Sequence, residues 1–142
     1  MTATHPMHQV AVFVFQETNP GPRYLLVRQH RRREGLWRPV LGPVRHDERL
    51  ESAALREVRD ETGIAHPRAL IDFGFRHREQ VGDLDLVDWG LGYDVGPETP
   101  DVHLGEEYRE FQWLEFEDAY RTIEVDPLRE AVLKLHLRLF GA

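Results

Sequence analysis

The chain has no cysteine, a single lysine at position 134 and no long apolar run. Without cysteine it has neither a disulfide framework nor a thiolate for catalysis or metal binding. No run of roughly 18 apolar residues occurs, so we expect no membrane-spanning segment. The first ten residues lack the basic and apolar regions of a secretion signal. These absences together predict a cytoplasmic protein.

The net charge of -7 argues against a surface that binds nucleic acid. An acidic protein can still bind a phosphate-bearing molecule through a local basic patch or a bridging cation. The stretch from Arg28 to Arg33 offers such a patch, and Arg28 is its best-placed member because it ends a predicted strand. The alternative for the basic loop at 29–35 is a solvated connection. With 142 residues, we expect one domain over 1–142.

An amphipathic helix is predicted from about residue 50 onwards. Leu50, Ala54 and Val58 recur at four-residue intervals, and Gly63 stands where a C-cap glycine is expected. On this helix Glu57, Asp60 and Glu61 occupy positions i, i+3 and i+4. Their carboxylates are therefore expected on one side of the helix.

That arrangement is unfavourable in a bare helix. Like charges at i and i+4 repel by a few tenths of a kcal/mol, roughly, and the last turns of a helix already carry partial negative charge. A bound divalent cation would turn the cost into a gain, and hard carboxylate oxygens favour Mg²⁺ or Mn²⁺. The alternative is a solvated acidic face. The eight histidines are scattered without the spacing of metal ligands.

Residues 42–64 resemble the signature of the Nudix hydrolases. The signature has Gly, five residues, Glu, seven residues, and then Arg-Glu-apolar-any-Glu-Glu-any-Gly-apolar. This segment matches every fixed position except one, where Asp60 stands for Glu. The resemblance implies an α/β (α+β) fold, an α/β/α sandwich with a mixed β-sheet. It also implies Mg- or Mn-dependent hydrolysis of a nucleoside diphosphate linked to another moiety.

The resemblance also implies roles for the motif residues. The Gly42 carbonyl and the carboxylates of Glu57, Asp60 and Glu61 would hold the metal. Arg56 would pair with Glu48 and lock the loop against the helix, and Gly63 would end that helix. The proposed catalytic residues are Glu57, Glu61 and Glu107, with Glu57 or Glu107 as the general base. Asp60 is one methylene shorter than Glu, so we expect weaker binding of one metal.

A second segment, 106–119, resembles the Glu-His-x-x-Tyr-x-Trp-Leu stretch of dihydroneopterin triphosphate pyrophosphatases and diadenosine tetraphosphate hydrolases. Glu107 matches the Glu of that pattern, and Tyr108 replaces its His. In those families the acidic residue approaches the metal from a separate loop. Glu106 and Glu110 are the alternatives to Glu107, and all three are also compatible with a solvated surface.

The remaining pattern predicts a hairpin, further strands and two C-terminal helices. Gly90 and Gly92 leave one strand face bare, which indicates a bulge or a bend, with room for a flat ligand as the alternative. Trp37 is assigned to the core rather than to ligand stacking. Asp126 and Pro127 are expected as the N-cap and first residue of the last helix. The expected strands are 8–15, 24–28, 70–75, 87–95 and 111–114, with loops at 17–22, 76–84 and 96–105 and a short helix over 115–120.

The sequence therefore predicts a metal-dependent Nudix pyrophosphohydrolase. Its substrate would be a nucleoside or pterin triphosphate or a related nucleotide derivative. The alternatives are a dinucleoside polyphosphate hydrolase and a non-catalytic Nudix-fold protein that senses a nucleotide. The expected partner is a small nucleotide-type molecule, without nucleic acid or membrane, and a homodimer is common in the resembled family.

Overall fold

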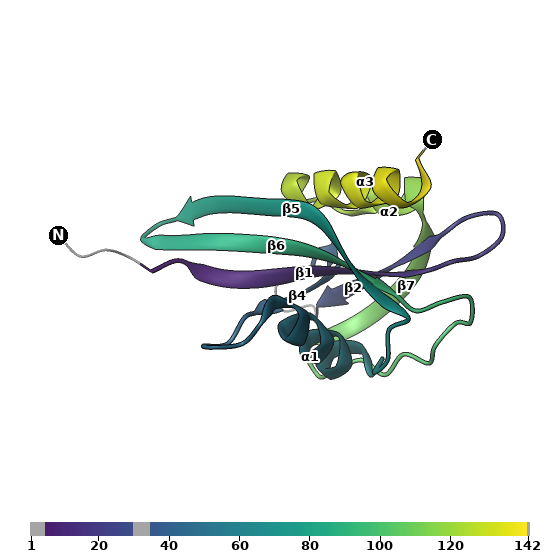
Figure 1. The fold of residues 1–142 in the computed structure, drawn as a ribbon, viewed down its shortest axis with the longest axis horizontal. Helices are drawn as coiled ribbons and strands as arrows, with labels where there is room; N and C mark the ends of the chain where they lie inside the picture. Colours follow the sequence, from purple (N-terminus) through teal and green to yellow (C-terminus); the bar gives the residue numbers. More distant parts are fainter. Residues whose placement is uncertain (1–4, 30–34, 142) are drawn as a thin grey trace.

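The computed structural model describes residues 5–29 and 35–141. In the described residues a mixed sheet lies between helices on its two faces, with α1 on one side and α2 and α3 on the other (Figure 1). This confirms the predicted α/β/α sandwich. None of these helices is both long and apolar enough to cross a bilayer. The elements, in order, are β1 (Met7–Gln16), β2 (Arg23–Gln29), β3 (Trp37–Arg38), β4 (Val40–Pro43), α1 (Leu50–Thr62), β5 (Ala69–Val81), β6 (Leu84–Asp94), β7 (Tyr108–Glu115), α2 (Phe116–Thr122) and α3 (Asp126–Phe140).

β1 is the central strand of the sheet. It runs parallel to β6, pairing Val12 with Leu91, and antiparallel to β2 and β4. The sheet order is β3-β2-β1-β6-β5, while β4 pairs with β1 and β7 pairs with β2. The antiparallel pairing of β1 with β2 confirms the predicted hairpin. Because β4 pairs with β1, the strand that precedes the motif helix lies next to the central strand of the sheet.

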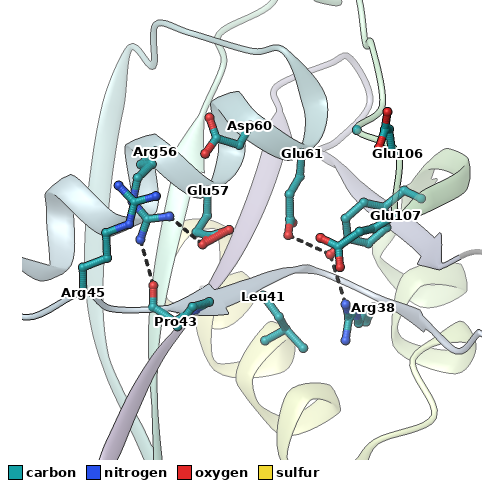
Figure 2. Close-up of a pocket in the computed structure, with 12 residues that line it drawn as sticks. Arg38, Leu41, Pro43, Arg45, Arg56, Glu57, Asp60, Glu61, Glu106 and Glu107 are labelled. Atoms are coloured by element: carbon teal, nitrogen blue, oxygen red, sulfur yellow. Dashed lines mark hydrogen bonds and ion pairs between the residues drawn. The ribbon is translucent and has the colours of Figure 1, made fainter.

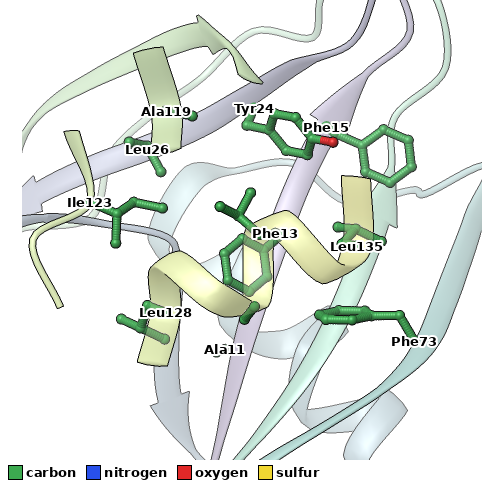
Figure 3. Close-up of a cluster of buried hydrophobic side chains, with 12 residues drawn as sticks. Ala11, Phe13, Phe15, Tyr24, Leu26, Phe73, Ala119, Ile123, Leu128 and Leu135 are labelled. Carbon is green, nitrogen blue, oxygen red and sulfur yellow. The ribbon is translucent and has the colours of Figure 1, made fainter. Parts of the chain in front are cut away.

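Alternate residues of β1 supply two hydrophobic cores, as expected for a strand buried on both faces. Val10, Val12 and Val14 pack with the apolar side of α1. Ala11, Phe13 and Phe15 pack on the other side with Leu128, Ala131, Val132 and Leu135 of α3 (Figure 3). Trp37 is partly buried against this second core, which confirms its assignment to the core.

Helix α1 ends where the sequence predicts. Gly63 adopts the left-handed conformation, with φ of 79°, and its N–H donates to the Arg59 carbonyl. Its position is also tight, because a Cβ there would lie 3.3 Å from the Cβ of His103, which would have to shift slightly. The capping glycine therefore fixes both the end of the helix and the approach of the 96–105 loop.

The predicted start of the last helix is wrong by one residue. Val125 is the N-cap, Asp126 is the first helical residue and Pro127 is the second. The structure shows no side-chain capping hydrogen bond. Asp126 instead contributes negative charge to the first turn, where the helix dipole favours it. Pro127 is tolerated there because N–H groups of the first turn have no helical partner.

The predicted loop at 76–84 is also wrong, because β5 continues to Val81 and only Gly82 and Asp83 separate it from β6. This end of the hairpin extends past α3 (Figure 1). From Arg76 onwards β5 is mostly exposed, so polar side chains are compatible with a strand there. Gly82 has a φ of 62°, as a tight hairpin turn with glycine in its first central position requires.

The two strand glycines serve packing. Between Asp72 and Arg76 the register of β5 against β6 shifts, and Gly90 lies opposite this bulge. A Cβ on Gly90 would lie 2.7 Å from the Cζ of Phe73, and one on Gly92 would lie 3.1 Å from a methyl group of Leu135. The structure therefore supports the bulge, and the side chains of Phe73 and Leu135 fill the space that side chains at these two positions would take.

We predict that Gly63→Ala lowers the free energy of unfolding by about 1–2 kcal/mol, because alanine is strained at positive φ. Urea denaturation of the two proteins measures the loss. Gly21→Ala is the matched control, since its added methyl group would meet nothing within 4 Å. The control should stay within about 0.5 kcal/mol. Equal stability of Gly63→Ala and wild type would contradict the capping role.

Candidate active site

Arg56 of α1 joins three parts of the predicted motif. Its Nε and Nη2 donate to the two Glu48 carboxylate oxygens at 2.9 and 2.8 Å, a bidentate pair. Nη1 donates to Glu57 Oε2 at 2.8 Å, and Nη2 also donates to the Pro43 carbonyl at 2.8 Å. The pairing of Arg56 with Glu48 is thus confirmed, and the same guanidinium also holds the end of β4.

The loop between β4 and α1 is closed by Glu48. Glu48 Oε1 also accepts from the Arg45 N–H at 2.9 Å. Hydrogen bonds from Arg56 and from this N–H lower the pKa of Glu48 to about 2, so the carboxylate stays charged. Asp47, just before Glu48, adopts a φ of 62°. The loop therefore contains a left-handed turn, which a short polar side chain tolerates.

Gly42 of β4 lies directly against the side chain of Glu57. A Cβ built on Gly42 would lie 2.1 Å from the carboxyl carbon of Glu57. No side chain fits at position 42 while Glu57 keeps this position. Burial raises the pKa of Glu57, and the neighbouring Arg56 opposes the rise. The strand and helix thus hold a carboxylate between them in a site that disfavours its charge.

Glu61, one turn further along α1, is buried and contacts β7. Its Oε1 accepts a hydrogen bond from the Tyr108 hydroxyl at 2.8 Å, and that hydroxyl accepts from Arg38 Nη2 at 3.0 Å. Burial raises the pKa of Glu61 to about 8, although the hydrogen bond from Tyr108 lowers it. Burial also raises the pKa of the Tyr108 hydroxyl, which therefore keeps its proton at neutral pH.

The 96–105 loop is attached to the C-terminal end of α1. The Gly105 N–H donates to the Glu61 carbonyl at 3.0 Å, and the His103 N–H donates to the Thr62 carbonyl at 2.8 Å. These bonds satisfy carbonyls at the helix end that have no helical partner. They also place the acidic pair Glu106 and Glu107, which follows the loop, opposite the helix.

These elements enclose a cavity of about 540 Å³ between β4, α1 and the start of β7. Figure 2 shows Glu57 and Glu61 pointing from α1 toward β4, with Glu106 and Glu107 on the facing segment. The cavity combines arginines with carboxylates. It is lined by Arg38, Leu41, Pro43, Arg45, Arg56, Glu57, Asp60, Glu61, Gly105, Glu106, Glu107 and Tyr108.

The other predicted site residues lie at different distances from this cavity. Asp60 lines it, but its side chain is 54% exposed and points away from β4 (Figure 2). Arg28 does not line it; its guanidinium lies over Trp37 and 3.7 Å from Glu110. A role for Arg28 in substrate binding therefore stays a prediction. Arg31 to Arg33 of the basic loop lie outside the described residues.

No three carboxylates or imidazoles of residues 5–29 and 35–141 converge on one point at metal-binding distance. The Glu57 carboxylate is hydrogen-bonded to Arg56, whereas the Glu61 carboxylate is hydrogen-bonded to Tyr108. The carboxylates that line the cavity nevertheless fit a hard divalent cation. Gly42 is not among the lining residues, so its carbonyl as a metal ligand stays a prediction. Glu61 Oε2 is buried and has no hydrogen-bond partner. A buried carboxylate oxygen of this kind is stabilised by a cation.

Three polar or charged residues that line the cavity, Arg38, Arg45 and Tyr108, were not predicted as site residues from the sequence. Arg45 lies inside the motif segment, and Arg38 stands four residues before Gly42. Their closeness to the motif in the chain could have indicated that both residues belong to the site. Tyr108 stands where the resembled segment has His, and that exchange was the available signal. What the sequence does not indicate is that Arg38 and Tyr108, 70 residues apart, meet at Glu61.

We predict that Gly42→Ala lowers kcat of the proposed hydrolysis by about 100-fold, because the methyl group displaces the Glu57 carboxylate. The neighbour that must move is a flexible side-chain end, so the free energy of unfolding should fall by only about 1 kcal/mol. Steady-state kinetics and urea denaturation test the two parts. Gly21→Ala again serves as the control, and wild-type kcat in Gly42→Ala would contradict the prediction.

Comparison with known proteins places the whole arrangement in one family. The family model described as the NUDIX domain matches residues 7–135. An Ap4A hydrolase structure from C. elegans is 19% identical, covering 96% of this chain and 99% of that chain with a TM-score of 0.82. The E. coli dihydroneopterin triphosphate pyrophosphohydrolase is 19% identical, covering 92% of this chain and 95% of that chain with a TM-score of 0.78. At these identities the structural likeness shows the fold.

A curated relative is more similar in sequence but much longer. An octanoyltransferase of Myxococcus xanthus is 34% identical over 134 residues, which are 92% of this chain and 37% of that protein. The chain thus spans a little over a third of that relative. The family match over nearly the full length, together with the Arg56 and Glu48 pair and the buried motif carboxylates, shows that the chain belongs to the NUDIX domain family.

Proposed function

We propose that this chain is a Mg²⁺- or Mn²⁺-dependent pyrophosphohydrolase. Its substrate would be a nucleoside or pterin triphosphate or a related nucleotide derivative, cleaved at a diphosphate linkage. The observation that carries the proposal is Glu61, whose buried Oε2 has no partner beside a cavity that Arg38 and Arg45 also line. Carboxylates would hold the cation, and guanidinium groups would hold phosphate oxygens.

The charges of the cavity fit a polyphosphate despite the acidity of the chain. Arg38 and Arg45 lie on the β3 and β4 side, while Glu57 and Glu61 come from α1. Tyr108 is the one aromatic residue among the lining side chains. Because charged groups dominate the lining, we assign the cavity to the phosphate chain and place the base or pterin ring outside it.

Hydrolysis at this site requires a water to attack phosphorus while the bridging P–O bond breaks. When bound, a divalent cation neutralises phosphate charge and makes the attacking water more acidic. Glu57 or Glu107 takes the proton of that water. Glu57 is held by Arg56, whereas Glu107 lies on the facing turn before β7. Arg56 and Glu48 act by holding Glu57 and β4 in place.

The similar proteins support this substrate class without deciding within it. One solved relative is named an Ap4A hydrolase and another a dihydroneopterin triphosphate pyrophosphohydrolase. Both names describe phosphoric anhydride substrates. A dinucleoside polyphosphate is therefore the second candidate substrate for this chain.

Octanoyl transfer is not proposed for this chain. The match covers only 37% of the length of the relative with that name. The matched stretch is nearly the same as the stretch that the NUDIX domain model covers. The cavity described above is built from the motif of that family, so the shared part is assigned to diphosphate chemistry.

The test is release of pyrophosphate and of orthophosphate from nucleoside triphosphates, dihydroneopterin triphosphate, dinucleoside polyphosphates and nucleotide sugars. Each substrate is assayed with Mg²⁺, with Mn²⁺ and with a chelator. We expect turnover of one class that requires the cation. Glu61→Gln should lower kcat by at least about 100-fold, since even groups that only support a metal ligand contribute about 10- to 100-fold.

Glu51→Gln is the matched control for that substitution, because Glu51 is an exposed residue in the first turn of the same helix. It should leave kcat unchanged. If no substrate turns over while Mn²⁺ still binds, the enzyme proposal is wrong and a nucleotide-binding sensor replaces it.

Asp60→Glu should keep or raise kcat and tighten Mn²⁺ binding. The longer side chain gives the carboxylate about 1.5 Å more reach, one C–C bond, from its exposed position. Kinetics at limiting Mn²⁺ measure the effect, and Asp118→Glu, at an exposed position on α2, is the control. A collapse of activity in Asp60→Glu would refute a metal-binding role in this geometry.

A further inference from the structure

Tyr108 contacts the motif carboxylate Glu61 from a different part of the fold. It is the first residue of β7, it is buried, and its hydroxyl lies 2.8 Å from Glu61 Oε1. The guanidinium of Arg38, from β3, lies 5.7 Å from the centre of the Tyr108 ring and donates to the same hydroxyl at 3.0 Å. Three elements of the domain therefore meet at this one hydroxyl group.

The direction of the hydrogen bonds in this chain is fixed by chemistry. A guanidinium carries only donors, so the Tyr108 oxygen must accept from Arg38. The single proton of the hydroxyl is then available for a second partner, and Glu61 Oε1 is the acceptor within reach. Arg38 thus orients the hydroxyl so that it donates to the carboxylate.

This arrangement distinguishes the two oxygens of Glu61. Oε1 is occupied by Tyr108, whereas Oε2 is buried without a hydrogen-bond partner. With Oε1 held, rotation of the carboxylate would break the bond from Tyr108. Glu61 therefore presents one defined oxygen.

We propose that Tyr108, oriented by Arg38, is a positioning residue that fixes Glu61 so that Oε2 is free to bind the divalent cation. The inference rests on the proposed function, in which Glu61 is a cation ligand. In this role the Tyr108 hydroxyl acts on the site through Glu61. It shapes the site by selecting the oxygen and the rotamer that Glu61 offers.

The test is Mn²⁺ binding without substrate, measured by titration calorimetry on wild type, Tyr108→Phe and Glu61→Gln. Phenylalanine keeps the buried ring and removes only the hydroxyl. We expect about tenfold weaker Mn²⁺ binding by Tyr108→Phe, which is the size expected for one hydrogen bond to a charged group. In the hydrolysis assay kcat should recover at saturating Mn²⁺, while KM for the substrate stays near the wild-type value.

Tyr120→Phe is the matched control. Tyr120 lies in α2, does not line the cavity, and also has an arginine, Arg129, 5.4 Å from its ring centre. It should bind Mn²⁺ as wild type does. This variant separates the loss of a tyrosine hydroxyl near an arginine from the loss of the contact with Glu61.

Two results would overturn the inference, and they can be told apart. If Glu61→Gln weakens Mn²⁺ binding but Tyr108→Phe does not, Glu61 is a ligand and Tyr108 merely packs. If Glu61→Gln binds Mn²⁺ as tightly as wild type, the proposed function is wrong at Glu61, and the role of Tyr108 is refuted with it.

Discussion

The candidate site depends on the contacts of one guanidinium. Arg56 bonds Glu48 in a bidentate pair and also reaches Glu57 and the Pro43 carbonyl. It therefore joins the loop after β4, the end of β4 and the helix that carries the carboxylates. Its pKa is raised, first by the hydrogen bond to Glu48, so the charge persists throughout the neutral range. Without this guanidinium, the carboxylates of Glu48 and Glu57 would lose the positive charge that both of them bond.

The site also contains buried carboxyl groups whose charged form is disfavoured by burial. Glu57 and Glu61 are buried acids whose pKa values are raised by burial, and Glu61 Oε2 has no partner. A purely structural helix would gain stability from apolar residues at these positions. Carboxylates kept there at a cost are typical of a functional site, because the binding of a cation offsets the cost. The stability of the fold comes from the two apolar cores on either side of β1.

The 96–105 loop closes the other side of the cavity through the backbone. Its N–H groups at His103 and Gly105 cap the last carbonyls of α1, and this fixes where β7 begins. Glu107 and Tyr108 follow Gly105 closely in the chain, so they line the cavity. A loop with no regular structure thus sets the geometry of catalytic candidates, since the helix end to which it bonds is rigid. The bond between Tyr108 and Glu61 completes the closure.

The sequence alone determined the motif helix, its capping Gly63 and the strand buried on both faces, because periodicity and capping are local properties of the chain. The sandwich fold was predicted from the resemblance to the family signature. It also identified Glu48 and Arg56 as partners through the family pattern. It misplaced residues 76–84, where exposed polar side chains resemble a loop although cross-strand hydrogen bonds hold a hairpin. Only the tertiary structure showed that Gly42 makes room for Glu57, that Asp60 points outward, and that Arg38 and Tyr108 meet Glu61. These contacts join residues far apart in the chain, and no local pattern encodes distances that depend on how the strands and helix pack.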